Sequence, residues 1–253
     1  MLWSLRPGLL APSFLACGVF LCCANLHAQQ NCNVEVKVLL SPSDIPAVVT
    51  ALRAKKETTG SVYFFDTDSL DLLAQGAILR VRRGPQNDLT VKFRPLNDKK
   101  FSAISVGSNA LKCEQDLTGD GETPSYSVTN PLNAEQFPQT GNDLSRMLSP
   151  EQLKLFNAAH ISVDWARVER LPEIASADWQ IRARLRLGKL TLELWEWPGG
   201  KALELSTKVS ADSASATYSQ LQQLVKAKHL SLSPEQHLKT TIALESITHT
   251  AAH

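Results

Sequence analysis

Charged and polar side chains recur at every second residue in six separate stretches, and this pattern limits the possible folds more than any other feature. The stretches are Glu35-Val-Lys37, Arg80-Val-Arg82, Lys92-Phe-Arg94, Glu114-Gln-Asp116, Arg182-Ala-Arg184-Leu-Arg186 and Glu204-Leu-Ser206. Because successive residues of a strand point to opposite faces, each stretch places its charges on one face and mostly apolar residues on the other. Together they predict a sheet with one charged face. If that sheet closes, the charges line an interior that can hold a polyanion.

The order of strand and helix signals predicts an α+β protein. We expect strands at residues 34–40, 62–66, 77–83, 89–94, 111–117, 161–171, 179–187, 190–197 and 201–209. Helical patterns cover residues 44–57, 70–73, 152–159, 213–229 and 234–247, and residues 118–129 are rich in turn formers. The short connections favour antiparallel pairing. The predicted fold is an eight-stranded antiparallel closed barrel with helices packed outside.

Residues 1–28 have the composition of an export signal. Arg6 is their one charged residue, an apolar run extends from Leu9 to Ala24, and Ala28 is small enough for a cleavage site. The run is shorter than the roughly 20 residues that span a bilayer. We therefore expect cleavage near Ala28, export to the periplasm or the outside, and no stable membrane insertion afterwards. Lipid attachment at Cys17 is the alternative, because the preceding residues resemble a lipoprotein cleavage box.

The remaining chain, residues 29–253, carries 25 basic and 25 acidic residues. This balance argues against a nucleic-acid binder, which needs an excess of basic surface. The whole chain is 43% hydrophobic and 20% charged, as in ordinary globular proteins. We expect a barrel at residues 29–210 and a C-terminal helical segment at 211–253 that packs on it. The oligomeric state has no signature in the sequence.

Two cysteines, Cys32 and Cys113, remain after removal of the signal. Because an exported chain meets an oxidising compartment, an even pair indicates a disulfide. Strand alternation agrees, since it places both sulfur atoms off the charged face, opposite Glu35 and Glu114. Two unpaired thiols on the apolar side are the alternative.

Several motifs resemble those of one known family. Tyr63-Phe-Phe-Asp-Thr67, Leu70-Asp-Leu-Leu73, Gly76 and Leu79-Arg-Val-Arg82 resemble the "YFDT … L … G … LRxR" stretch of the CYTH superfamily, the triphosphate tunnel metalloenzymes. Further strands of that family resemble Thr90-Val-Lys92, residues 112–116 and Ala202-Leu-Glu-Leu-Ser206. The resemblance implies an eight-stranded antiparallel barrel that forms a tunnel. Members of the family bind triphosphates or polyphosphate with Mg2+ or Mn2+, and many hydrolyse them.

The basic strands form the predicted phosphate site. A triphosphate must be neutralised by several cations, for which arginine forks bind phosphate oxygens in pairs and lysine acts as a point charge. The predicted phosphate-binding residues are Arg80, Arg82, Lys92, Arg94, Arg182, Arg184 and Arg186. The alternative is that these side chains are solvated and take part in mutual salt bridges.

The carboxylates on alternating strands form the predicted metal site, because hard divalent cations prefer carboxylate oxygens. They are Glu35, Glu114, Glu193 and Glu204, and Asp116 fits metal ligation and simple charge balance equally well. A metal held there polarises phosphoryl oxygens and lowers the pKa of an attacking water. Glu35 and Lys37 are the predicted catalytic residues, with Lys37 neutralising charge near the cleaved group.

The sequence departs from the family motifs at two carboxylate positions that bear on metal binding. The opening "ExExK" appears as Asn33-Val-Glu35-Val-Lys37, and the closing "ELE" ends in Ser206, so two negative charges are missing. We therefore expect a weaker metal site, favour binding of triphosphate or polyphosphate over turnover, and leave hydrolysis open. Two alternatives are an exported non-enzymatic barrel that binds another anionic ligand and a structural protein whose charged interior is wholly self-paired.

Overall fold

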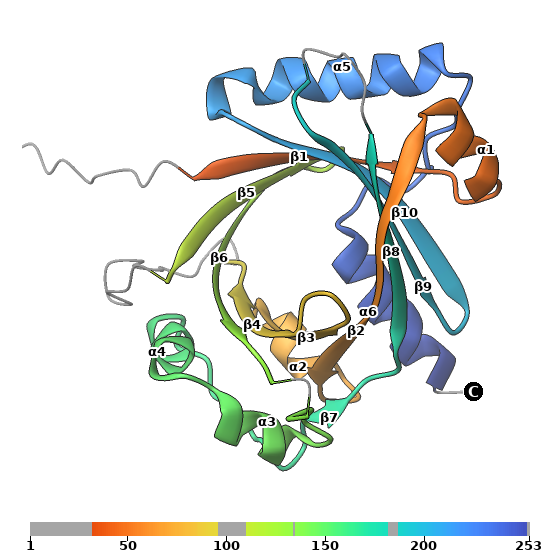
Figure 1. The fold of residues 1–253 in the computed structure, drawn as a ribbon. Coiled ribbons are helices and arrows are strands. Elements are labelled where there is room, and N and C mark those ends of the chain that lie inside the picture. Colours follow the sequence, from red (N-terminus) through yellow and green to blue (C-terminus); the bar gives the residue numbers. More distant parts are fainter. Residues whose placement is uncertain (1–31, 96–109, 134, 182–186, 252–253) are drawn as a thin grey trace, which may run out of the picture. The chain divides into compact units, whose positions relative to one another are not determined.

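The computed structural model describes residues 32–95, 110–133, 135–181 and 187–251. The predicted signal, Cys17 and the predicted phosphate-binding residues Arg182, Arg184 and Arg186 lie outside these ranges. Figure 1 shows strands arranged in a ring. In chain order the ring contains β1 (Asn33–Leu40), β2 (Ala54–Asp66), β3 (Ala77–Arg83), β4 (Asp88–Phe93), β5 (Lys112–Thr118), β6 (Gly121–Pro131), β8 (Ile174–Ile181), β9 (Leu190–Trp197) and β10 (Gly200–Val209).

The described strands close into a barrel. They pair in the order β3-β4-β6-β5-β1-β10-β9-β8-β2, and β2 pairs again with β3. A further short strand, β7 (Glu169–Arg170), pairs with β2 outside the ring. Every neighbouring pair in the ring is antiparallel except β1 and β5, which are parallel. In a closed ring with an odd number of strands, the directions of neighbouring strands cannot alternate throughout. The predicted eight antiparallel strands are thus corrected to nine strands with one parallel pair, while the closed α+β barrel is confirmed.

The additional strand is β6, which lies in the segment that the sequence indicated as turns. Gly121 has a φ of 112° and begins β6 directly after the turn that follows β5. From there the chain is extended and pairs with β5 on one side and β4 on the other. The strand predicted at residues 161–171 shortens to β7. Turn-forming residues inside an otherwise regular strand therefore hid β6.

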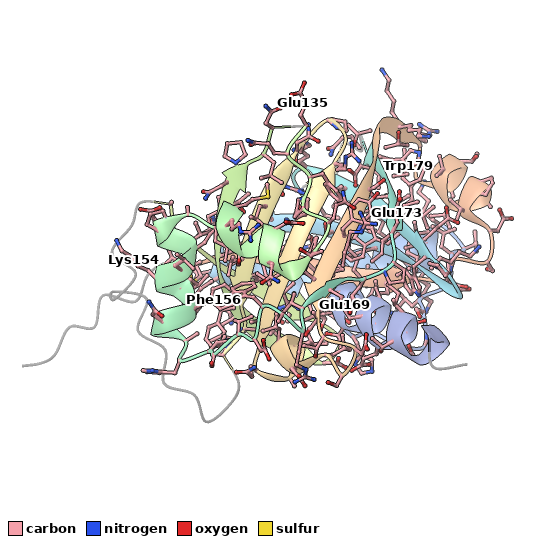
Figure 2. All side chains as sticks on the ribbon, turned by 90° about the horizontal axis from the view of Figure 1, so that it is seen from below. Glu135, Lys154, Phe156, Glu169, Glu173 and Trp179 are labelled. Carbon is pink, nitrogen blue, oxygen red and sulfur yellow. A yellow bond between two sulfur atoms is a disulfide. The ribbon has the colours of Figure 1, made fainter. Side chains whose placement is uncertain are left out.

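Two hydrophobic cores lie between the outward strand faces and the helices around the barrel. One core joins β2, β3, β4 and β6 to α3 (Gly141–Met147) and α4 (Pro150–Ala158). In Figure 2, α4 is seen with Phe156, which is buried in this core, and Lys154, which is exposed. The other core joins β1, β8, β9 and β10 to α1 (Ile45–Ala51) and α5 (Ala214–Ala227), which follows a short 3-10 turn at Ala211–Ser213. These four helices pack outside the barrel, as predicted.

A third core lies on the opposite, inward strand faces. Phe64 belongs to it, whereas its neighbours Tyr63 and Phe65 belong to an outer core, as strand alternation requires. Helix α6 (Lys239–Ala251) packs Ala243 and Leu244 against these inward residues. The C-terminal helix therefore reaches the same strand faces that carry the alternating charges.

The Tyr63–Arg82 motif builds the connection between β2 and β3. The buried Asp66 carboxylate accepts hydrogen bonds from the backbone N–H groups of Leu72 at 2.9 Å and Leu73 at 3.0 Å, in α2 (Asp71–Ala74). Gly76 has a φ of 85°, and a Cβ atom there would lie 2.2 Å from the carbonyl oxygen of Arg94. This contact excludes a side chain at residue 76. Asp66 and Gly76 thus fix the turn that aligns β3 with β4.

The predicted disulfide between Cys32 and Cys113 is confirmed, with Cα atoms 4.9 Å apart. It joins the residue before β1 to the second residue of β5 and so links the parallel pair covalently. Among the described residues, no helix has both the length and the apolar character that crossing a bilayer requires.

Candidate functional site

The barrel interior contains a polar cavity of about 280 Å³. Its wall includes eight basic and four acidic side chains: Glu35, Lys37, Arg80, Arg82, Lys92, Arg94, Lys112, Glu114, Glu193, Glu204, Lys208 and Lys239. All nine predicted site residues within the described ranges are in this set, so the alternating pattern did place these charges on one inward surface. Their individual roles stay predictions.

The β3–β4 pair carries the arginines of the cavity wall. Arg80 lies opposite Thr90 and Arg82 opposite Asp88 in the observed register. The Arg82 Nε donates to both Asp88 oxygens, at 3.1 and 3.0 Å, and Nη2 donates to one of them as well. The carboxylate therefore neutralises Arg82.

Arg80 has no such carboxylate partner. Its Nη2 donates a hydrogen bond to the Thr90 hydroxyl at 3.4 Å, and its buried Nε has no hydrogen-bond partner. Among the described residues, no carboxylate forms an ion pair with this guanidinium. Burial lowers the pKa of Arg80 to about 10, and the nearby Arg82 charge acts in the same direction. A buried cation of this kind is costly unless an anion is supplied from elsewhere.

Asp116 neutralises two cations from other strands. Its fully buried carboxylate lies 2.8 Å from the Lys37 Nζ and 3.3 Å from the Arg94 Nη2. Burial alone would raise the pKa of Asp116, but Lys37, Lys92 and Arg94 hold it well below its usual value. Burial would likewise lower the pKa of Lys37, but the surrounding carboxylates, Glu204 first among them, raise it above its usual value. This arrangement favours charge balance over metal ligation for Asp116.

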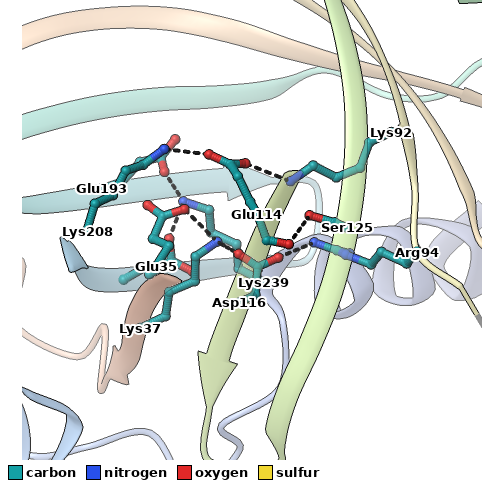
Figure 3. A network of polar contacts seen from close by, with 11 residues as sticks. Glu35, Lys37, Lys92, Arg94, Glu114, Asp116, Ser125, Glu193, Lys208 and Lys239 are labelled. Carbon is teal, nitrogen blue, oxygen red and sulfur yellow. Dashed lines mark hydrogen bonds and ion pairs between the residues drawn. The ribbon is translucent and has the colours of Figure 1, made fainter. Parts of the chain in front are cut away.

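Glu114 lies between two lysines, as Figure 3 shows. Its carboxylate is 3.6 Å from the Lys92 Nζ and accepts a hydrogen bond from Lys208 at 2.5 Å. Burial lowers the pKa of Lys92 to about 8, although Asp116 and Glu114 act in the opposite direction. The Lys92 amine therefore loses its charge at a lower pH than an ordinary lysine does.

Lys239, which the sequence analysis missed, holds two of the predicted metal ligands. Its Nζ lies 3.1 Å from the Glu204 Oε1 and donates a hydrogen bond to the Glu193 Oε2. The ammonium is 4.5 Å from the centroid of the Trp195 ring, and the Trp195 Nε1 donates to Glu193 at 2.7 Å. Burial would lower the pKa of Lys239, but Glu193 and Glu204 raise it above its usual value.

Other residues of the wall were also missed, although some had a signal. Thr90, Ser127 and Thr129 contribute hydroxyl groups, and the last two belong to an alternating polar series in β6. Lys208 continues the alternation of Glu204 and Ser206 along β10. Extension of the period-two pattern would have found these residues.

The carboxylates of the wall do not fit a preformed site for Mg2+ or Mn2+. Among the described residues, no group of three or more His, Cys, Asp and Glu side chains could hold a metal ion. Each predicted ligand already has a lysine partner: Glu35 pairs with Lys37 at 3.3 Å, Glu114 with Lys92 and Lys208, and Glu193 and Glu204 with Lys239. Ser206 supplies a hydroxyl where the family motif has a carboxylate, and Asn33 is exposed at the start of β1.

The sequence matches no family model and no curated protein. Several solved structures resemble it, including the following two. HpAC1 from Hippeastrum, a proposed adenylyl cyclase with a dominant triphosphatase activity, aligns with a TM-score of 0.54 and 18% identity over 79% of this chain and 90% of that one. A proposed adenylate cyclase from Bacillus halodurans aligns with a TM-score of 0.54 and 16% identity over 82% of this chain and 95% of that one.

At these identities the likeness establishes the fold. Both alignments span nearly the whole length of the related chains, so the likeness covers the complete barrel and not a single hairpin. The fold expected from the Tyr63–Arg82 motif is therefore confirmed: the chain shares the closed-barrel fold of these two proteins.

Proposed function

We propose that the barrel interior binds inorganic triphosphate or another short polyphosphate. The observation that carries this proposal is Arg80, a half-buried arginine of the cavity wall whose buried Nε has no hydrogen-bond partner and whose guanidinium has no carboxylate partner among the described residues. Structural arginines in protein interiors are paired, because an unpaired buried charge costs several kcal/mol. A phosphate oxygen is the partner that a guanidinium fork binds best.

The charge of the wall supports the same ligand class. Eight basic and four acidic side chains line the cavity. Asp88 and Asp116 pair with wall residues and Asp178 lies opposite Glu193, so that among the described residues eight basic groups meet seven carboxylates and one positive charge is in excess. A wholly self-paired interior, the structural alternative, would have no excess. A multiply charged anion supplies the missing negative charge.

The size of the cavity favours a compact ligand. At about 280 Å³ it lies at the lower end of the ~300–1,000 Å³ that is usual for small-molecule sites. Phe64, Ile78 and Trp195 are the apolar residues of the wall, and the remainder is polar or charged. A bare phosphate chain uses such a wall better than a nucleotide, whose base and sugar need additional apolar volume. The triphosphatase activity of HpAC1 agrees with this ligand class.

Binding is the function that this geometry supports best, because the carboxylates that would hold a catalytic metal are paired with lysines. If the protein hydrolyses triphosphate, Glu35 and Lys37 remain the predicted catalytic residues, and Mg2+ or Mn2+ would supply Lewis-acid chemistry. The predicted export signal and the Cys32–Cys113 disulfide support a location outside the cytoplasm. Fractionation of cells that express the full chain tests that location.

The binding proposal is tested by titration calorimetry of the protein with tripolyphosphate, sulfate and ATP. We expect tripolyphosphate to bind at least about tenfold more tightly than either of the others, since it engages several cations within a compact volume. Arg80→Met should weaken that binding about tenfold or more. Arg83→Met is the matched control, because Arg83 is exposed on the same strand. Equal affinity for sulfate and tripolyphosphate would contradict the proposal.

Hydrolysis is tested separately by phosphate release from tripolyphosphate with Mg2+ or Mn2+, with Glu35→Gln as the control. Release that disappears in Glu35→Gln identifies a triphosphatase. Tight binding without release identifies a binding protein. If tripolyphosphate neither binds nor is hydrolysed, another anion is the ligand or the charged interior is structural.

A further inference from the structure

Two carboxylates face each other across a pair of neighbouring strands in the cavity wall. Glu193 of β9 and Glu204 of β10 are direct partners in the antiparallel register. Like charges directly opposite each other destabilise a sheet, so this pair requires a cation between its members. In proteins that handle phosphate, a divalent metal ion commonly supplies such a charge. Here the Lys239 ammonium supplies it.

The Lys239 side chain is held by the packing of the fold and is not a flexible side chain on the surface. Its side chain is 7% exposed and that of Glu204 is 5% exposed. The residue begins α6, whose Ala243 and Leu244 are buried against the inward strand faces. The ammonium also lies over the face of Trp195, a favourable position for a cation. Packing of α6 therefore holds one positive charge at this place in the cavity.

We propose that Lys239 is the resident cation of the cavity and allows polyphosphate to bind without a divalent metal. This inference rests on the proposed function. The Lys239 ammonium has three N–H donors, and contacts with Glu193 and Glu204 use two of them. One donor is left for a phosphate oxygen. The ammonium thus provides the charge neutralisation and the phosphate contact that a carboxylate-bound metal would otherwise provide.

The first test uses the unaltered protein. Tripolyphosphate is titrated by calorimetry in EDTA and again in Mg2+, and Mn2+ alone is titrated while its free ion is followed by electron paramagnetic resonance. We expect tripolyphosphate to bind in EDTA at least as tightly as in Mg2+, because the paired carboxylates leave no ligand set for a metal and Mg2+ lowers the charge of the anion itself. We also expect no saturable Mn2+ binding in the absence of phosphate.

The second test uses Lys239→Met, which keeps most of the aliphatic stem but removes the ammonium. This change exposes the facing carboxylates Glu193 and Glu204 to each other and makes the wall more negative by one charge. We expect tripolyphosphate affinity in EDTA to fall about tenfold or more, Mn2+ to gain a saturable site, and Mg2+ to restore most of the lost affinity. Lys226→Met is the matched control, since Lys226 is exposed on α5.

The outcomes separate this inference from the proposed function. If the unaltered protein binds tripolyphosphate with Mg2+ but not with EDTA, the proposed function stands and the role of Lys239 is refuted. Saturable binding of Mn2+ to the unaltered protein also refutes the role of Lys239. That result does not depend on whether a variant folds. If tripolyphosphate binds under neither condition, the proposed function itself fails. Metal-independent binding that is lost in Lys239→Met and recovered with Mg2+ supports both.

Discussion

Arg80 stands opposite Thr90 across the β3–β4 pair, and its Nη2 donates a hydrogen bond to the Thr90 hydroxyl at 3.4 Å. Two residues further along β3, Arg82 stands opposite Asp88 in the same way and is neutralised by it. The two arginines share a strand and a face, but only Arg82 has a carboxylate opposite. The residue at position 90 therefore decides whether the cavity keeps an uncompensated guanidinium.

Thr90→Asp should place a carboxylate opposite Arg80 and remove that uncompensated charge. We expect the free energy of unfolding to rise by about 1 kcal/mol and tripolyphosphate affinity to fall about tenfold or more, because the anion must compete with the new carboxylate. Urea denaturation and calorimetry measure the two effects. Thr90→Val, which adds no charge, should change affinity by less than about threefold. A similar loss in both variants would mean that the hydroxyl matters and the charge does not.

Polyphosphate binding should weaken as the pH rises through about 8. Burial lowers the pKa of Lys92 to about 8, so this amine is protonated below that pH and neutral above it. Since the anion binds the protonated form, affinity should fall up to tenfold for each pH unit above 8, and binding near pH 8 should take up a proton. Calorimetry in buffers with different ionisation enthalpies measures that uptake. In Lys92→Met both effects should disappear.

Lys92→Met should also stabilise the protein without ligand at pH 7. The folded pKa of about 8 lies below the usual 10.5, so below pH 8 the fold bears the full cost of burying the protonated amine. The variant removes that cost, and Glu114 keeps Lys208 as its partner. We expect the free energy of unfolding to rise by about 1 kcal/mol in urea denaturation at pH 7. A decrease would show that the Lys92–Glu114 contact outweighs the cost of burial.

Asp116→Asn should destabilise the fold strongly. The fully buried carboxylate balances Lys37 and Arg94, and an amide would leave both cations without that charge. Loss of one member of a buried ion pair typically costs about 3–5 kcal/mol. Urea denaturation measures the change, with Glu235→Gln at an exposed position as the control. A change below about 1 kcal/mol would show that water or the remaining carboxylates replace Asp116.

Removal of the Cys32–Cys113 disulfide should lower the free energy of unfolding by about 2–4 kcal/mol, as is typical for a bridge that closes a long loop. The two cysteines are separated by 81 residues. Cys113→Ser paired with Cys32→Ser avoids a free thiol. Hydrogen exchange should show the loss first in β1 and β5, because the bridge joins the two strands of the parallel pair. Uniform loss of protection across the barrel would contradict this local effect.

The inward charged surface was predictable because side chains two residues apart in a strand point to the same face. Each charged stretch that the structure describes contributes charged side chains to the wall of the same cavity, although Asp116 is not among them. The number of strands was not predictable, since Gly121 and Pro124 give β6 the local composition of a turn. Only its pairing with β4 and β5 on both sides compensates for these residues. Tertiary contacts thus overrode local preference in β6.

The charge partners within the site could not be read from the sequence. The sequence contains the charged groups, but the pairing of Arg82 with Asp88 and of Asp116 with Lys37 depends on strand register and barrel closure. Lys239 begins a helix next to Leu238 and Thr240, in a context no different from that of an exposed helix start. Its position in the cavity follows from how α6 packs.

The parallel pairing of β1 with β5 has a consequence for the order in which the barrel can assemble. In the folded protein β1 lies between β5 and β10, and both of these strands come later in the chain. Synthesis begins at the N-terminus, so β1 is made before both of its partners. Until they are present, β1 is an unpaired strand edge with the apolar residues Val34, Val36 and Val38. Because Cys32 and Cys113 both precede residues 200–209 in the chain, their bond can hold β5 on one side of β1 before β10 covers the other. A disulfide formed at that stage would shorten the period during which the β1 edge is exposed to aggregation.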